Sequence, residues 1–211
     1  MKRERGFTLI EIAIVLVIIG LLLGGILKGQ EMITQARIRN VVNDLNSVSV
    51  AYYAYQDRYR AIPGDDPNAN GRWTGTTSGN GNGQVDGNFN ATPSANPPPA
   101  GEESNLFWQH LRLAGLVAGP STGAGSANPP QNAVGGVTGV QNSALGLNGL
   151  VVCTSNLPGK IANAVDSQLD DGRPNTGSVR GTTASPLPTT APTDTSYVDD
   201  GATQYTICKN I

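Results

Sequence analysis

The chain has 211 residues, of which 38% are hydrophobic, with 27 glycines and 14 prolines. This length leaves room for one globular domain beside a membrane segment, and the composition predicts a small core with long loops. The formal net charge is −2. Without the first six residues it is −4, with 11 basic against 15 acidic side chains. A chain of this sign gives no electrostatic reason to bind nucleic acid.

The amino terminus combines a short basic segment, "MKRERG", with an apolar run from Phe7 to Leu27. Thr8 and Glu11 are the only polar side chains in that run of 21 residues. An apolar helix of about 20 residues spans the hydrocarbon core of a bilayer. Positive flanks stay on the cytoplasmic side, so the basic segment predicts a cytoplasmic amino end and a carboxyl end outside.

Three kinds of protein have such a start: a cleaved secretory protein, a plainly anchored protein and a processed filament subunit. A secretory signal has an apolar core of about 7–15 residues and a small-residue cleavage site. Here the run is longer, and "LKGQEMI" follows it without such a site. A plain anchor gives no reason for Glu11, since an acid near the centre of a membrane helix costs about 2.5–3.5 kcal/mol.

The segment "RGFTLIE" closely resembles the processing site of type IV prepilins and of type II secretion pseudopilins. The resemblance rests on the basic leader, the Gly-Phe pair, the Thr-Leu-Ile-Glu tail and the uninterrupted apolar run, and it is strong over about the first third of the chain. It implies that a membrane-embedded aspartic peptidase cuts after Gly6. It also implies that Phe7 becomes the new amino terminus and is N-methylated.

The same resemblance explains Glu11. Cleavage after Gly6 places an ammonium group on Phe7, four residues before Glu11, and residues four apart share one face of a helix. In a filament, the resemblance implies that Glu11 pairs with the amine of a neighbouring subunit and fixes the axial register. An unpaired charge in an apolar bundle costs several kcal/mol. The alternative is an acid near the helix end that extends to the lipid headgroups.

An amphipathic pattern continues over residues 28–61. Apolar residues recur at steps of three and four, the pattern of one buried helix face. They are Ile38, Val41, Val42, Leu45, Val48, Tyr52, Tyr55 and Tyr59. Together with residues 7–27 this predicts one helix of about 50 residues, about 80 Å long. Pro63 and Gly64 in "AIPGDDP" end it.

Residues 62–211 are expected to form a loop-rich head. The stretch from "NANGRW" to "PPPAGEE" predicts an irregular loop. "SNLFWQHLRLAGLV" predicts a helix with Ser104 at its N-cap and Gly115 near its end. "GKIANAVDSQLDDG" predicts another helix, and "GLVVCTS" and "ATQYTICKNI" predict strands. The apolar residues expected to face inward from the first helix are Leu106, Phe107, Leu111 and Ala114.

The two cysteines, Cys153 and Cys208, fall in the two predicted strands. Beyond a membrane-targeting start the chain is expected in an oxidising compartment, where a cysteine pair is typical of a disulfide. A metal or redox pair is the alternative, but neither cysteine has a C-x-x-C partner. Many type IV pilins carry a carboxyl-terminal region bounded by a disulfide, and this chain resembles them in that respect.

Catalytic motifs are weak. "GPSTG" around Ser121 matches G-x-S-x-G by letter, but it lies in a Gly/Pro loop, whereas a nucleophile elbow needs a strand before it and a helix after it. His110, the one histidine, precedes Ser121, against the chain order of that fold. We interpret His110 as a structural or solvated side chain. No convergent acid, base and nucleophile are visible, so we expect no enzyme.

A structural calcium ion is the one cofactor that the sequence raises. Oxygen side chains alternate in "NGNGQVDG", at Asn80, Asn82, Gln84 and Asp86. This segment offers one carboxylate, and its turn glycine is out of register with a calcium loop. The main expectation is that the chain has no cofactor. The resemblance to major pseudopilins, which bind calcium through carboxyl-terminal loops, raises calcium as the alternative and makes Asp170 and Asp171 in "DSQLDDG" its candidate ligands. Asp-Gly is also ordinary turn chemistry.

The sequence therefore predicts a pilin-like α+β fold in four parts. These are a cleaved leader (1–6), a transmembrane and polymerisation helix (7–27), its amphipathic continuation (28–61) and a head (62–211) with a small antiparallel sheet, long loops and a disulfide. The implied function is a structural subunit of a type IV pilus or pilus-like filament. The alternatives are a type II secretion pseudopilin and a monomeric, membrane-tethered module that binds calcium or a glycan.

The resemblance also implies partners and a location. The partners are other copies of the chain and other pilins, the prepilin peptidase and methyltransferase, and an inner-membrane assembly platform. The precursor is expected in the inner membrane. The assembled subunit is expected in a surface pilus or a periplasmic filament.

Overall fold

The computed structural model describes residues 8–211, and these divide into two compact units, residues 8–37 and 38–211. Helix α1 (Leu9–Tyr59) has 51 residues and begins in the first unit and ends in the second. No proline interrupts it. Just beyond its end Arg60 has a φ of 56°, and Pro63 and Gly64 follow, so the backbone turns away where the sequence predicted.

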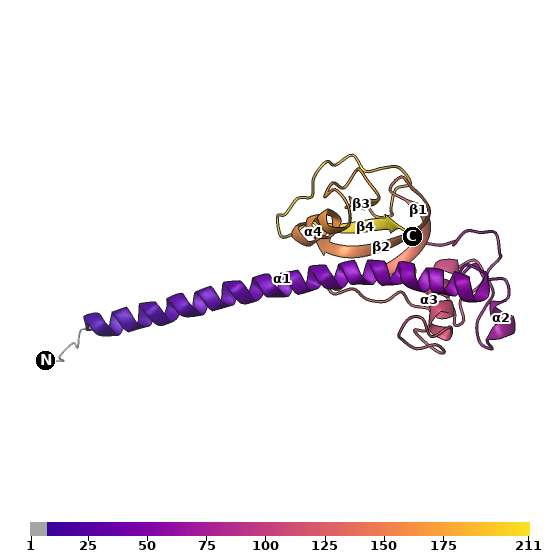
Figure 1. Cartoon of the computed structure of the whole chain (residues 1–211), viewed down its shortest axis with the longest axis horizontal. Helices are drawn as coiled ribbons and strands as arrows, with labels where there is room; N and C mark the ends of the chain where they lie inside the picture. The colour runs from indigo at the N-terminus through magenta and orange to yellow at the C-terminus, as the bar shows by residue number, and fades with distance from the viewer. Residues whose placement is uncertain (1–7) are drawn as a thin grey trace. The chain divides into compact units, whose positions relative to one another are not determined.

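The second unit is built on one four-stranded antiparallel sheet (Figure 1). Its strands are β1 (Thr138–Ala144), β2 (Leu147–Pro158), β3 (Val179–Thr182) and β4 (Gln204–Asn210), in the order β1-β2-β4-β3. β1 and β2 form a hairpin whose turn residues Leu145 and Gly146 have φ values of 54° and 74°. Positive φ at both positions is the geometry of a tight hairpin turn.

One face of the sheet carries the main core. The buried stripe of α1 within the second unit, Ile38 to Tyr55, packs in one cluster with Val152 and Ile207 of the sheet and with apolar residues of the other helices. Its buried members are Ile38, Val41, Leu45, Val48, Ala51 and Tyr55. The expected fold, a long amino-terminal helix packed on a small antiparallel sheet, is therefore confirmed.

The opposite face carries a second, smaller cluster around the disulfide. Val151 and Cys153 of β2 belong to it, whereas Val152 belongs to the first, because successive strand residues point to opposite faces. Cys153 and Cys208 lie directly opposite each other on β2 and β4, and their disulfide is fully buried. The predicted disulfide is thus confirmed.

Three short helices complete the head: α2 (Ala69–Arg72), α3 (Glu103–Leu113) and α4 (Gly159–Leu169). Leu106, Phe107 and Leu111 of α3 are buried as expected. The prediction of Ser104 as N-cap was wrong. The helix already begins at Glu103, and the Ser104 hydroxyl is buried without a hydrogen-bond partner.

Candidate functional site

Helix α1 begins with a reciprocal cap made by Thr8 and Glu11. Glu11 Oε2 accepts hydrogen bonds from the Thr8 amide (2.8 Å) and from Thr8 Oγ1 (2.7 Å), and the Glu11 amide donates to Thr8 Oγ1 (3.4 Å). This is the capping-box pattern, Ser or Thr followed three residues later by Glu or Gln, and it satisfies amides that the first turn leaves without a partner. Glu11 therefore has a local role that sequence reasoning missed, although "TLIE" contains the signal.

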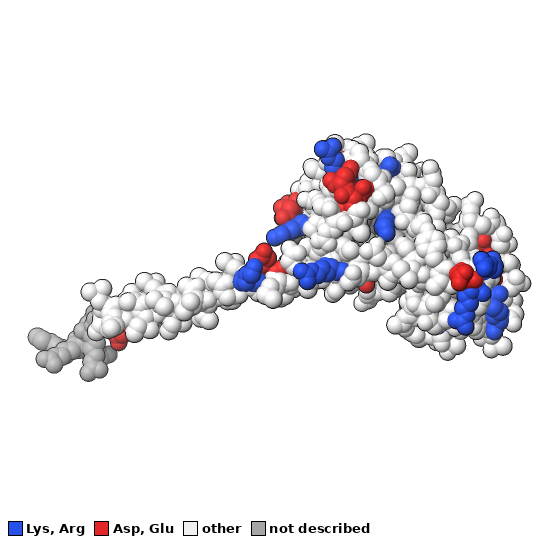
Figure 2. Space-filling model, viewed as in Figure 1, with Lys and Arg blue, Asp and Glu red and all other residues white. Residues whose placement is uncertain are grey.

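The helix that follows this cap exposes apolar side chains all round within the first unit. Leu9, Leu16 and Leu21 are 93%, 63% and 73% exposed, and the other large apolar residues up to Ile33 behave similarly. Helix α1 is long and apolar enough to cross a membrane, and its most apolar stretch has no buried residue. Figure 2 shows this stretch almost without charged atoms. Such a surface needs lipid or another apolar helix around it.

The far end of α1, within the head, is fixed by a buried polar group. Tyr55 Oη donates to Asp66 Oδ2 (2.7 Å), and Arg72 forms an ion pair with the same carboxylate. His110 is fully buried beside Tyr55, with ring centroids 6.4 Å apart. Its Nδ1 accepts the Gly64 amide (3.0 Å), so Nε2, which lies 2.9 Å from the Thr77 carbonyl, carries the proton.

These contacts assign His110 a structural role. Burial is the main cause that lowers the pKa of His110 to about 4, and nearby Arg72 adds to it, although the Thr77 hydrogen bond opposes the change. With both ring nitrogens engaged, His110 of α3 is held as a neutral side chain packed against the turn after α1. "GPSTG" lies in the loop after α3, with no strand before it. Among residues 8–211, no hydrogen bond joins His110 to Ser121 of "GPSTG", so the two do not form a catalytic pair.

The "NGNGQVDG" segment is a loop held by two carboxylates distant in sequence. Asp65, 4% exposed, accepts the amides of Gly81, Asn82 and Gly83 at 2.5–3.1 Å. Glu103, fully buried, accepts the amides of Asn80 (2.9 Å) and Asp86 (3.0 Å).

Two asparagine side chains of this loop stabilise its own backbone, whereas Gln84 Oε1 accepts a hydrogen bond from Asn142 Nδ2 of β1 (2.7 Å). Asn80 Oδ1 accepts the Asn82 amide, and Asn82 Oδ1 accepts the Gln84 amide. Burial raises the pKa of Glu103, with a smaller contribution from the charges of Asp65 and Asp86. The alternation therefore marks Asx turns, and no feature of the spacing could have revealed Asp65 and Glu103 as the anchors.

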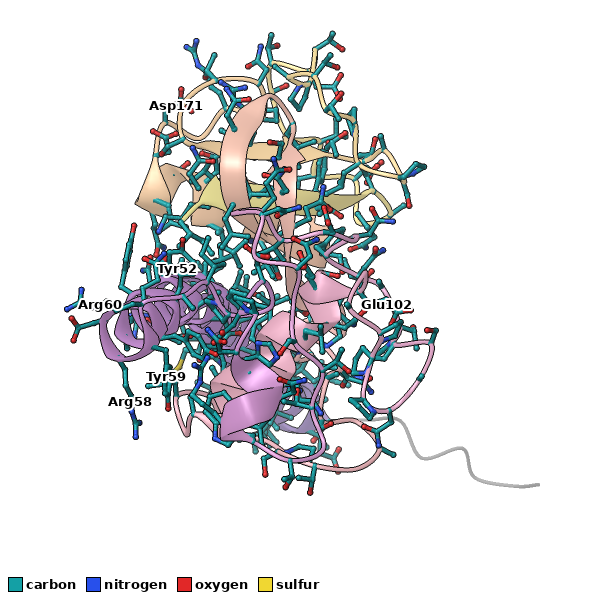
Figure 3. The ribbon with its side chains drawn as sticks, turned by 90° about the vertical axis from the view of Figure 1, so that its right-hand side faces the viewer. Tyr52, Arg58, Tyr59, Arg60, Glu102 and Asp171 are labelled. Atoms are coloured by element: carbon teal, nitrogen blue, oxygen red, sulfur yellow. A yellow bond between two sulfur atoms is a disulfide. The ribbon has the colours of Figure 1, made fainter. Side chains whose placement is uncertain are left out.

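The expected calcium ligands Asp170 and Asp171 lie together with Asp166, with one oxygen of each within 4.8 Å of the others. Each carboxylate already accepts hydrogen bonds: Asp170 from the Ser178 and Val179 amides, and Asp171 from Arg173 and Thr176. The loop uses these acids to shape itself. Figure 3 shows Asp171 well away from Tyr52 and Tyr59 of α1. Calcium at Asp170 and Asp171 stays a prediction.

Two expected processing residues, Gly6 and Phe7, lie outside the described residues. From Thr8 on, a capped apolar helix leads into an α+β head with a buried disulfide, which is the arrangement that the sequence predicted. Residues 1–27 match the family described as the prokaryotic N-terminal methylation motif. The resemblance of the amino terminus to the pilin and pseudopilin class is thereby confirmed.

Among solved structures, the chain is similar to that of the major type IV pilin PilA1 from Clostridium difficile. The identity is 14% and the TM-score 0.40, over 83% of this chain and 96% of that one. No curated protein is significantly similar to the chain.

Proposed function

We propose that the chain is a structural subunit of a type IV pilus or pilus-like filament. It is made as a membrane-anchored precursor and is assembled through the part of α1 that lies in the first unit. The observation that carries the proposal is the exposed apolar surface of the helix, which starts inside a methylation motif. In the membrane, lipid covers that surface. In a filament, the equivalent helices of neighbouring copies cover it.

Processing after Gly6 and N-methylation of Phe7 belong to this proposal, as do the peptidase, the assembly platform and a cytoplasmic amino end of the precursor. In a filament, Glu11 pairs with the Phe7 amine of a neighbour. The capping box is compatible with that role. Among residues 8–211 both hydrogen bonds to the Glu11 carboxylate fall on Oε2, which leaves Oε1 for an amine.

Three substitutions separate the capping role from the pairing role. Glu11→Gln keeps a side chain that can cap but removes the charge, because Gln also serves in a capping box. Glu11→Ala removes both functions. Thr8→Ala removes the hydroxyl half of the cap and leaves the carboxylate. The readouts are filament yield and the amount of processed subunit in the membrane.

If charge pairing drives assembly, Glu11→Gln and Glu11→Ala both lose filaments while Thr8→Ala retains them. Filaments from Glu11→Gln at the wild-type yield would contradict charge pairing and leave only the cap. Unchanged behaviour of Glu11→Ala would favour the monomeric, tethered module instead.

A type II secretion pseudopilin is the second candidate. The absence of proline throughout α1 and the acidic cluster of Asp166, Asp170 and Asp171 favour it, whereas the carboxyl-terminal disulfide favours a pilus subunit. Mechanical shearing distinguishes the two. A surface pilus releases the subunit into the sheared fraction, and a periplasmic pseudopilus does not.

A further inference from the structure

The connection between β3 and β4 contains a segment of unusual composition, residues 183–196, "TASPLPTTAPTDTS". We call it the Thr/Pro segment. Seven of its residues carry hydroxyls, three are prolines, and Asp194 is its one charged residue. The hydroxyl residues are Thr183, Ser185, Thr189, Thr190, Thr193, Thr195 and Ser196.

All seven of these residues are exposed. Within residues 8–211, none of their hydroxyls makes a hydrogen bond to another protein group, whereas the residues that flank the segment do. The Thr182 hydroxyl accepts the Ala184 amide, Tyr197 Oη donates to Asp166, and the Thr203 hydroxyl donates to Asp200. The hydroxyls of the segment thus have no part in holding the head together.

The backbone of the segment is nevertheless anchored. The amides of Leu145 and Gly146, in the β1–β2 turn, donate to the carbonyls of Pro188 and Thr189, both at 2.8 Å. Leu187 packs against the second hydrophobic cluster, on the face of the sheet opposite to α1. Figure 1 shows the loops after β3 on the side of the sheet away from the helix. The fold therefore presents this row of hydroxyls outward on a fixed support.

We propose that the Thr/Pro segment is a site of O-linked glycosylation, with Thr189, Thr190, Thr193 and Thr195 as the main acceptors. Ser/Thr-rich sequence with interspersed proline is the composition of O-glycosylated stalks. Proline disfavours helix and central-strand pairing, so a modifying enzyme meets an extended backbone. The location of the head outside the cytoplasm rests on the proposed function.

The chemistry needs no redox partner. A threonine Oγ attacks C1 of a saccharide activated as a diphosphate ester, so that the Oγ–C1 bond forms and the bond between C1 and the phosphate oxygen breaks. The hydroxyl proton leaves with the released diphosphate. A bulky, hydrated group at these positions breaks no hydrogen bond among the described residues, because the acceptor hydroxyls make none there.

The test is peptide mass mapping of the full chain purified from its native envelope. After reduction of the disulfide, trypsin cuts behind Arg180 and Lys209, so one peptide, 181–209, contains the whole Thr/Pro segment. We expect this peptide to be heavier than its sequence by one or more saccharide residues. Fragmentation that preserves the sugar should place it within residues 183–196.

A fourfold variant, with alanine at Thr189, Thr190, Thr193 and Thr195, should lose most or all of the added mass. Because these side chains are exposed and their hydroxyls make no hydrogen bond within residues 8–211, the head should fold as in the wild type. The control carries Thr92→Ala, an exposed threonine in another proline-rich loop, and should keep the full added mass. Peptide 181–209 at its bare mass, or an added mass that the fourfold substitution leaves unchanged, overturns the inference.

The same digest tests the proposed function separately through the peptide that ends at Lys28. A methylated peptide that starts at Phe7 supports processing, whereas one that starts at Gly6, after tryptic cleavage at Arg5, contradicts it. A processed terminus with a bare 181–209 peptide refutes glycosylation alone. An unprocessed terminus with a glycosylated segment refutes processing alone.

Discussion

Replacement of His110 by asparagine should change how the stability of the head depends on pH. Asn Oδ1 can still accept the Gly64 amide, but the group that titrates is gone. In the wild type, the folded-state pKa of about 4 lies below the usual value of 6.5. The unfolded chain therefore takes up a proton first as the pH falls. This contribution to stability is complete above pH 6.5 and is lost as the pH falls towards 4.

The size of the effect follows from that difference in pKa. Each pH unit between 6.5 and about 4 corresponds to about 1.4 kcal/mol, so the loss is roughly 3 kcal/mol. Asp166 acts in the opposite direction, because burial raises its pKa to about 6. Its contribution is present below about pH 3.9 and is lost as the pH rises to 6. The pH profile of the wild type alone therefore hides the titration of His110.

The measurement is urea unfolding of the full chain in an uncharged detergent, followed by the fluorescence of Trp73 and Trp108 between pH 7 and pH 4. Subtraction of the His110→Asn profile from the wild-type profile cancels Asp166 and the other shared groups. We expect the difference in unfolding free energy to shrink by roughly 3 kcal/mol from pH 7 to pH 4. A difference that stays constant with pH would refute the assignment of a neutral, buried His110.

Three further variants test the packing of the head by the same urea assay at pH 7. Asp66→Asn breaks a buried ion pair and should cost about 3 kcal/mol, the low end for such a loss because the arginine partner is partly exposed. Cys153→Ser with Cys208→Ser opens a disulfide between residues 55 apart and should cost about 4 kcal/mol. Gly79→Ala drives a methyl group into the backbone of the turn after α1 and should cost about 1–3 kcal/mol or more.

Each variant has its own control. Gly71→Ala adds a methyl group where no atom lies within 4 Å, so equal effects of Gly71→Ala and Gly79→Ala would contradict the steric argument. For the disulfide, dithiothreitol should reproduce the loss in the wild type and leave the double serine variant unchanged. A loss below 1 kcal/mol for Asp66→Asn would mean that its ion pair adds little to the stability of the turn.

Strong periodicity made the elements around the core predictable. The three- and four-residue spacing in α1, the apolar face of α4 and the β-branched residues of "GLVVCTS" all appear as expected. β1 and β3 were not predicted, because each contains a glycine, "TGVQNSA" has two β-branched residues in seven, and "VRGT" has four residues in all. α2 was also missed. It lies inside the polar stretch, and its four residues are too few to show the spacing of apolar residues that marks a helix.

For the candidate site, the amino-terminal motif could be recognised from local residues alone, because helix capping and apolar length are encoded within one short segment. The polar anchors of the head could not. Asp65 lies 16–18 residues from the amides it accepts, and the partner of Asp166 is Tyr197, 31 residues away. Pairings of this kind depend on the folded backbone, which no local pattern of residue types specifies.

The position of β4 has a consequence for the order in which the head forms. β3 precedes β4 in the chain, and β4 is the one strand with which β3 pairs in the described sheet. β2 pairs with β1 on one side and with β4 on the other. Until residues 204–210 are in place, only the β1–β2 hairpin of the sheet can close, and Cys153 is without its disulfide partner. Contacts of such long sequence separation form slowly. Completion of the sheet, and with it formation of the disulfide, therefore waits for β4.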